Sequence, residues 1–113
     1  MSIEKPNEAM NDDELNALFD IDKIVHEPAR LLIMAYLYVI DSADFLFLLN
    51  QTKLTRGNLS SHLSKLEKVG YVSISKEFVG KIPRTILALT DEGRAAFQTY
   101  RGKLEEILRN LPG

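Results

Sequence analysis

The spacing of hydrophobic residues changes from a helical to a strand-like pattern near position 70. Before this point, Leu59, Leu63 and Leu66 recur at intervals of four and three, which places them on one face of a helix. After it, apolar and polar residues alternate roughly by two over 71–75 and again over 85–89, as they do in half-buried strands. The pattern therefore predicts a set of helices interrupted by a two-stranded hairpin.

Candidate capping residues set the boundaries of the predicted helices. The side chains of Asn11, Ser42, Thr55 and Thr90 can accept hydrogen bonds from the free N–H groups at a helix start. Pro28 suits the first turn of the remaining helix, whose composition indicates that it is largely buried. The first predicted helix begins at 11. The other four cover 29–40, about 42–51, about 56–69 and 91–111.

The segment between the two predicted strands, 79–83, has the composition of a turn. Gly80 permits a tight turn, and Pro83 lacks the N–H group that strand pairing uses. A short helix joined by a tight turn to an amphipathic helix is the helix-turn-helix plan, and a hairpin directly after it adds a wing. The sequence thus predicts a mostly helical α+β fold, a winged helix-turn-helix with a long C-terminal helix. Residues 1–10 have no clear period and are expected to be flexible, whereas 11–113 are expected to form one domain.

The net charge of -2 hides a separation of charge along the chain. Residues 1–27 carry eight acidic side chains against two lysines, whereas residues 51–89 carry seven basic side chains against two glutamates. A basic segment inside an acidic chain is typical of a protein that binds an anionic partner. Chance clustering on solvated surfaces is the alternative explanation.

The basic segment includes the outward face of the helix predicted at 56–69. Opposite its leucines this face carries small residues, hydroxyl groups, an amide and two lysines, while Glu67 lies to the side. Small side chains let a backbone approach the major groove, and asparagine and lysine can contact base edges or phosphates. A solvated amphipathic helix is the alternative. The helix residues predicted to bind DNA are Thr55, Arg56, Gly57, Asn58, Ser61, Ser64, Lys65 and Lys68.

Three cations, Lys76, Lys81 and Arg84, flank the predicted hairpin tip. Two strands that bring these charges to one tip suit contact with phosphates or with the minor groove. Lysines also protect exposed strands from pairing with other chains, which is the alternative role. We predict DNA contact, so these three residues join the predicted DNA-binding set.

Several stretches of the chain resemble a known family. The stretch 55–72, TRGNLSSHLSKLEKVGYV, is similar to the recognition-helix region of small winged-helix transcription regulators of the MarR/ArsR-like group. The resemblance continues through 76–85 and 89–94 and begins upstream at 22–31, so that it covers about residues 20–100. It implies a sequence-specific transcription regulator that binds double-stranded DNA as a homodimer.

Two features depart from the pattern of that group. The turn over 50–53 lacks the glycine often found at this corner, and the short helix is unusually apolar over 45–49. Phe47 cannot face the same core as Phe45. It is expected to pack against the first or last helix, with a partner surface as the alternative.

The predicted last helix is longer than a small globule needs and carries an apolar stripe. The stripe can fold back on its own chain or pair with a second copy, and the family resemblance implies the pairing. Two recognition helices would then meet successive grooves of one DNA site. The predicted dimer residues are Phe97, Tyr100, Leu104, Ile107, Leu108 and Leu111.

The residue inventory argues against several other functions. Without cysteines and with only two histidines, thiol chemistry and an imidazole-rich zinc site are not expected. No nucleophile–base pair or phosphate-binding glycine loop occurs at usable spacing, so neither an enzyme nor a cofactor is expected. No apolar segment is long enough to span a membrane, and a cytoplasmic location is expected. A winged helix that binds proteins instead of DNA is the alternative function. A small-molecule effector is compatible with the sequence but has no support in it.

A few other polar or aromatic residues receive structural interpretations. His26 and His62 are expected to be satisfied structural histidines, and Tyr36 and Tyr38 to belong to the core. For Arg30 the sequence leaves two partners open, a phosphate or an internal acid.

Overall fold

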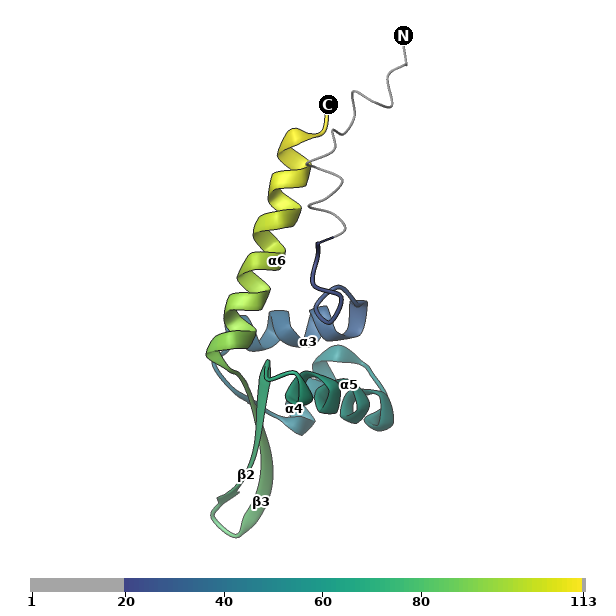
Figure 1. The fold of residues 1–113 in the computed structure, drawn as a ribbon. Helices are drawn as coiled ribbons and strands as arrows, with labels where there is room; N and C mark the ends of the chain where they lie inside the picture. The colour runs from purple at the N-terminus through teal and green to yellow at the C-terminus, as the bar shows by residue number, and fades with distance from the viewer. Residues whose placement is uncertain (1–19, 113) are drawn as a thin grey trace.

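The computed structural model describes residues 20–112, so the helix predicted to begin at Asn11 lies outside the described residues. The described chain contains four helices and a three-stranded antiparallel sheet (Figure 1). The elements are α3 (Pro28–Val39), β1 (Ala43–Asp44), α4 (Phe45–Thr52), α5 (Arg56–Lys68), β2 (Val72–Val79), β3 (Ile82–Leu89) and α6 (Asp91–Asn110). The predicted winged helix-turn-helix with a long last helix is confirmed.

Side-chain caps define where the helices begin. Thr55 and Thr90 cap α5 and α6, as predicted, through bonds from Asn58 N and Gly93 N. The prediction that Ser42 caps the short helix is wrong, because Asp44 is the cap and accepts from Phe47 N at 2.7 Å. The residues before this cap form the short strand β1 instead of a first helical turn.

The wing is longer than the sequence predicted. β2 and β3 pair along their whole length, from Val72 opposite Leu89 to Val79 opposite Ile82, so that only residues 80 and 81 form the turn. Pro83 was predicted to discourage pairing, but it lies directly opposite Phe78. In an antiparallel ladder every second residue points its N–H away from its partner, and a proline there removes no bond between the strands.

The corner between α4 and α5 has left-handed backbone geometry without a glycine. Lys53 takes φ 62° and ψ 17° and donates its N–H to Leu49 O at 3.2 Å. Thr52 supports the corner, since its hydroxyl donates to Leu48 O at 2.7 Å. A lysine in this conformation costs about 1 kcal/mol relative to glycine.

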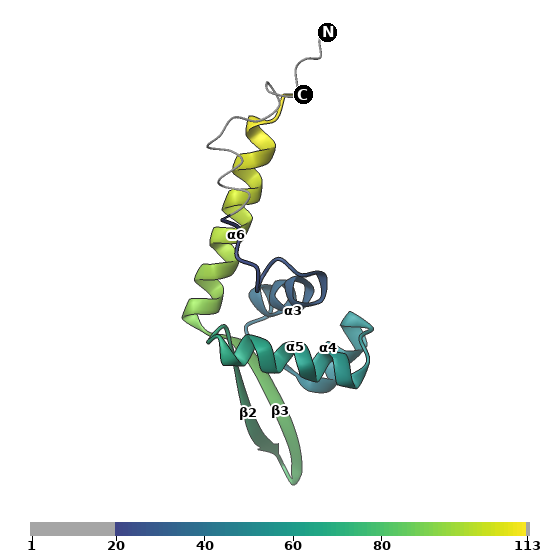
Figure 2. The same ribbon diagram turned by 45° about the vertical axis from the view of Figure 1, so that its right-hand side comes forward.

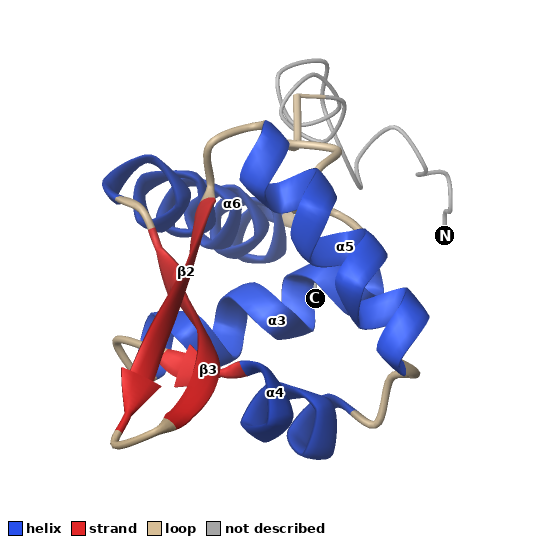
Figure 3. Cartoon of the chain, turned by 90° about the horizontal axis from the view of Figure 1, so that it is seen from below, coloured by secondary structure: helices blue, strands red, loops and turns tan. Residues whose placement is uncertain are grey.

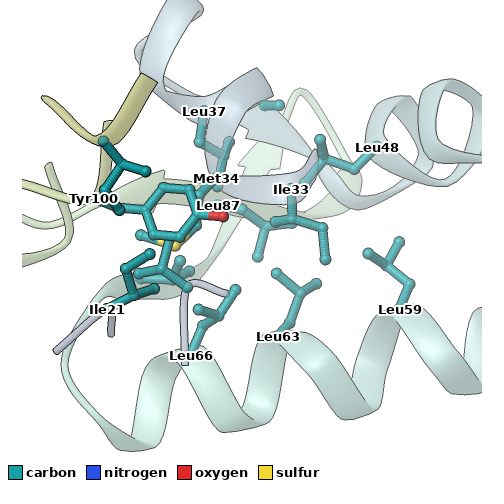
Figure 4. Packing of buried hydrophobic residues seen from close by; sticks show 14 residues of the cluster. Ile21, Ile33, Met34, Leu37, Leu48, Leu59, Leu63, Leu66, Leu87 and Tyr100 are labelled. Atoms are coloured by element: carbon teal, nitrogen blue, oxygen red, sulfur yellow. The ribbon is translucent and has the colours of Figure 1, made fainter. Parts of the chain in front are cut away.

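The hydrophobic core lies between α3, α5 and the sheet. Figure 4 shows the three leucines of α5 pointing toward the buried face of α3. Both faces are fully or almost fully buried, and Leu87 of β3 closes the core from the sheet side. The buried residues of the two helices are Ile33, Met34, Leu37, Leu59, Leu63 and Leu66. The helical spacing that the sequence showed therefore corresponds to the real core face of α5.

The start of α6 is attached to the start of the wing. Thr90 donates its hydroxyl to Gly70 O at 2.5 Å and its N–H to Tyr71 O at 3.0 Å. Gly93 lies so close to Tyr71 that a Cβ atom built on it would meet Tyr71 O at 2.0 Å. Farther along, Phe97 packs on Tyr38 with ring centroids 4.9 Å apart. From this base α6 runs away from the globule, so that its C-terminal end lies opposite the wing (Figure 1).

Candidate nucleic-acid interface

Helix α5 and the wing lie at the same end of the molecule. Figure 2 shows α5 lying across the globule with β2 and β3 extending below it, and Figure 3 shows both elements from that end. Every predicted DNA-binding residue on and just before α5 is exposed. These are Thr55, Arg56, Gly57, Asn58, Ser61, Ser64, Lys65 and Lys68. The structure therefore brings the predicted helix face and the wing to one side of the protein.

The first turn of α5 offers backbone as well as side chains. Thr55 Oγ1 accepts the N–H of Asn58 at 3.1 Å, which satisfies one of the free donors of the helix start. In the described part of the chain, no atom beyond its chain neighbours and the backbone of its own helix lies within 4 Å of the position a Cβ would take on Gly57. The backbone at Gly57 is thus open to a ligand, and free N–H groups at a helix start favour anions such as phosphate.

Arg56 lies where α5 approaches α4 and the wing. Its guanidinium carbon is 5.9 Å from the centre of the Phe45 ring, a distance compatible with a cation–π contact. A groove lined by both residues and by Ile82 to Thr85 separates the start of α5 from β3. Arg56 therefore lines this groove, at the same end of the molecule as α5 and the wing.

The three predicted wing cations differ in their surroundings. Lys76 and Lys81 are exposed, and neither forms an ion pair with any residue between 20 and 112. Arg84 instead donates to Asp44 Oδ2 at 3.0 Å, while the other oxygen of Asp44 caps α4. Arg84 thus links the wing to the helix-turn-helix, which makes it less available to a phosphate than the two lysines.

Sequence reasoning missed three polar residues at this end of the molecule. Lys53 is exposed at the corner before α5, and its positive charge in the basic segment could have identified it as a candidate. Ser60 and Thr85 line a shallow groove between α5 and the wing, together with Phe45 and Ser64. Periodicity could not find these hydroxyl groups, because only the folded chain places β3 beside α5.

The residues with structural interpretations have partners within the chain. His26 Nδ1 is 2.9 Å from the hydroxyl of Tyr100, and His62 Nδ1 is 3.8 Å from Glu27 Oε1. Arg30, whose partner the sequence left open, donates to Ile24 O at 2.7 Å. Its guanidinium therefore binds a backbone carbonyl inside the chain.

A partly buried acid–phenol contact joins the segment before α3 to the base of the wing. Tyr71 donates its hydroxyl to Asp22 Oδ2 at 2.5 Å, and Asp22 Oδ1 accepts the N–H of Ile24 at 2.8 Å. The hydrogen bond to Asp22, together with burial and the charges of Asp22 and Glu92, raises the pKa of Tyr71 to about 12. This contact holds the base of the wing against the globule.

The apolar stripe of α6 divides into two parts. Phe97 and Leu104 are partly buried against the core, and Tyr100 and Ile107 are buried, with 5% and 7% exposure. Leu108 and Leu111 are exposed, at 67% and 37%. The surface that a second copy can cover without rearrangement is therefore the C-terminal part of the stripe.

Two further features bear on function. Within residues 20–112, no three acidic or histidine side chains gather in a way that could hold a metal ion. None of the helices in that part of the chain combines the length and hydrophobicity needed to cross a membrane.

The sequence matches a family model described as a winged helix DNA-binding domain over residues 29–108. The chain belongs to this family. This winged-helix protein is also 35% identical over 89 residues to an uncharacterized protein of Methanocaldococcus jannaschii, covering 79% of this chain and 97% of the relative. The predicted resemblance to small winged-helix regulators is confirmed by this family match and by similar solved structures of transcriptional regulators.

Two of those structures illustrate the range of similarity. A transcriptional regulator homologue from Pyrococcus horikoshii has a TM-score of 0.78 at 31% identity, over 86% of this chain and 95% of its own. The PcaV transcriptional regulator from Streptomyces coelicolor, solved with its natural ligand, has a TM-score of 0.67 at 16% identity. The match covers 86% of this chain and 67% of PcaV, and at that identity it supports the fold alone.

Proposed function

We propose that this winged-helix protein is a non-enzymatic, sequence-specific transcription regulator that binds double-stranded DNA as a homodimer. In this proposal the outward face of α5 enters the major groove, and the wing lies on the backbone or in the minor groove. Residues 11–113 act as one domain that includes the dimerisation helix. The protein works in the compartment that holds the chromosome, which we propose to be the cytoplasm.

One observation carries the proposal. The exposed α5 face, with its small residues, Asn58 and Lys65, lies at the same end of the molecule as the exposed wing lysines Lys76 and Lys81. A helix that presents such a face beside a positive hairpin matches the geometry by which winged helices contact a groove and its phosphates. The membership of the family of DNA-binding winged helices supports the same reading.

The proposed dimer uses the exposed end of α6. The C-terminal end of α6 lies far from α5 (Figure 1), so a two-fold axis at its exposed Leu108 and Leu111 leaves both recognition helices free. One recognition helix contacts too few base pairs to select a site among competing genomic sequences. Two copies require an inverted repeat whose half-sites lie about 10–10.5 base pairs apart, or a multiple of this spacing.

Selection of bound fragments from random DNA tests the proposal directly. An inverted repeat is expected, and failure to enrich any sequence would refute sequence-specific binding. With the selected site, Lys65→Ala and Asn58→Ala should each weaken binding by about 1–3 kcal/mol. Arg101→Ala is the control for Lys65→Ala, because it removes the same charge from an exposed side chain of α6 that belongs neither to α5 nor to the proposed dimer residues. Equal affinities for wild type and both α5 variants would refute the assignment of this face.

A second candidate function is protein binding without DNA, and one surface favours it. Leu32, Tyr36 and Val39 of α3 and Phe47 of α4 line an apolar hollow, and all except the half-buried Tyr36 are exposed. Phe47 was expected to pack in the core, and the structure instead leaves it 41% exposed beside α3. Salt separates the two functions, since binding through several phosphates weakens steeply as salt rises and an apolar contact does not.

A further inference from the structure

The tip of the wing is apolar on both of its faces. Phe78, Val79 and Ile82 are exposed by 75%, 57% and 58%, and Pro83 is also exposed. Val79 lies directly opposite Ile82, and Phe78 lies directly opposite Pro83. Residues directly opposite in a ladder share a face, and successive residues alternate, so each face of the tip carries one apolar pair.

The fold obtains no core packing from these side chains. The buried residues of the hairpin, Val72 and Leu87, lie at its base, and the core cluster of the described chain does not include the tip. Single exposed hydrophobic residues are ordinary, but three large ones gathered around a two-residue turn form a surface that favours a partner. An exposed apolar hairpin also risks pairing with other chains.

The surroundings of the tip indicate which partner fits. Lys81 occupies the turn itself, and Lys76 lies on the same face as Phe78, two residues before it. Glu77 is the single acid in β2 and β3, and it lies opposite Arg84, which carries the compensating charge. The tip thus combines apolar side chains with flanking positive charge and projects from the same end as α5. Apolar side chains beside lysines suit a DNA groove in which an opened base step exposes the apolar faces of the bases and phosphates line the rim.

We propose that the hairpin tip enters the minor groove beside the site read by α5, where Phe78 from one face of the tip and Ile82 from the other form an apolar wedge that partly unstacks one base step. Such wedges kink the duplex toward the major groove, by about 20–90° in proteins that use them. The bend brings the flanking phosphates toward Lys76 and Lys81. Pyrimidine–purine steps unstack most easily, so the wedge selects these steps without hydrogen bonds to the bases. The inference rests on the proposed DNA-binding function.

The experiment compares wild type with the double variant Phe78→Ser, Ile82→Ser on the selected DNA site. Energy transfer between dyes at the ends of the fragment measures bending, and 2-aminopurine placed at successive flanking steps measures unstacking. Wild type is expected to bend the fragment and to raise 2-aminopurine fluorescence at one step in each half-site. The double variant is expected to lose both signals and to bind about 10-fold more weakly, with a shallower salt dependence because the unbent DNA keeps its flanking phosphates away from Lys76 and Lys81.

Control variants separate the wedge from folding. Val69→Ala truncates a side chain that is 39% exposed at the C-terminal end of α5, outside the predicted DNA-binding set, and should leave bending and affinity unchanged. Phe78→Leu keeps an apolar side chain at the tip and should retain the bend. Circular dichroism and thermal unfolding of the double variant should match wild type, since the replaced side chains are exposed.

The outcomes distinguish the wedge from the proposed function. If wild type binds the selected site without bending or unstacking it, or if the double variant retains both signals, the wedge is refuted while DNA binding stands. If the double substitution lowers the mass of the protein in solution and leaves DNA bending intact, the tip binds a second copy, which also refutes the wedge. If wild type selects no DNA, the proposed function fails and the wedge fails with it.

Discussion

The close contact between α6 and the base of the wing predicts that Gly93→Ala destabilises the protein. A Cβ at this position would lie 2.0 Å from Tyr71 O and 2.8 Å from Tyr71 C, whereas ordinary contacts begin near 3.4 Å. Both atoms belong to the backbone, so no side-chain rotation relieves the clash. Gly93→Ala therefore forces the helix away from residue 71 by roughly 1 Å or more, which disturbs the bond from Thr90 N to Tyr71 O.

The expected change in the free energy of unfolding is the balance of two opposing effects. Overpacking costs about 1–3 kcal/mol, and each strained or lost hydrogen bond adds about 1 kcal/mol. Alanine returns about 0.5–1 kcal/mol, because it restricts the unfolded chain and favours a helix. We expect Gly93→Ala to lower the free energy of unfolding by about 1–3.5 kcal/mol.

Gly102 in the same helix provides the matched control. Among residues 20–112, no atom beyond its chain neighbours and the backbone of its own helix lies within 4 Å of the Cβ that an alanine would place at Gly102, so Gly102→Ala should stabilise the protein by about 0.5–1 kcal/mol. Urea unfolding followed by circular dichroism, at two protein concentrations, measures both variants and reveals any contribution from a dimer. A Gly93→Ala protein as stable as wild type would refute the close packing of α6 on the wing.

Three further predictions concern pH, the wing and assembly. Because the raised pKa of Tyr71 favours its protonated form in the folded state, its contribution to stability is complete below pH 10 and is lost as pH approaches 12. Urea unfolding from pH 9 to 12 should therefore show a steeper loss for wild type than for Tyr71→Phe, and equal slopes would contradict the contact with Asp22. Asp44→Asn keeps a capping side chain but weakens the ion pair with Arg84. The free energy of unfolding should therefore change by less than about 1 kcal/mol, while the NMR order parameters of the wing should fall. Unchanged order parameters would refute the link between the wing and the helix-turn-helix. Leu108→Asp should yield monomers in light scattering, and a wild-type mass near 12.8 kDa would refute the dimer.

Local features of the sequence determined much of the fold and of the candidate site. The interval between Leu59, Leu63 and Leu66 identified the core face of α5, and therefore also its opposite, exposed face. Thr55 and Thr90 marked two helix starts correctly. These features depend on residues within one or two turns of each other, so helical periodicity and capping chemistry predict them without knowledge of the rest of the chain.

Tertiary structure decided the features that depend on pairing between distant residues. The two-residue strand β1 is too short to show a period, and it exists because Ala43 and Asp44 pair with Leu87 and Ile86 of β3. That pairing moved the start of α4 and placed Asp44 within reach of Arg84, forty positions along the chain. Backbone pairing between β2 and β3 likewise continues beyond Pro83, to Val79 and Ile82. Local sequence does not contain these partners, and only the folded chain brings them within bonding distance.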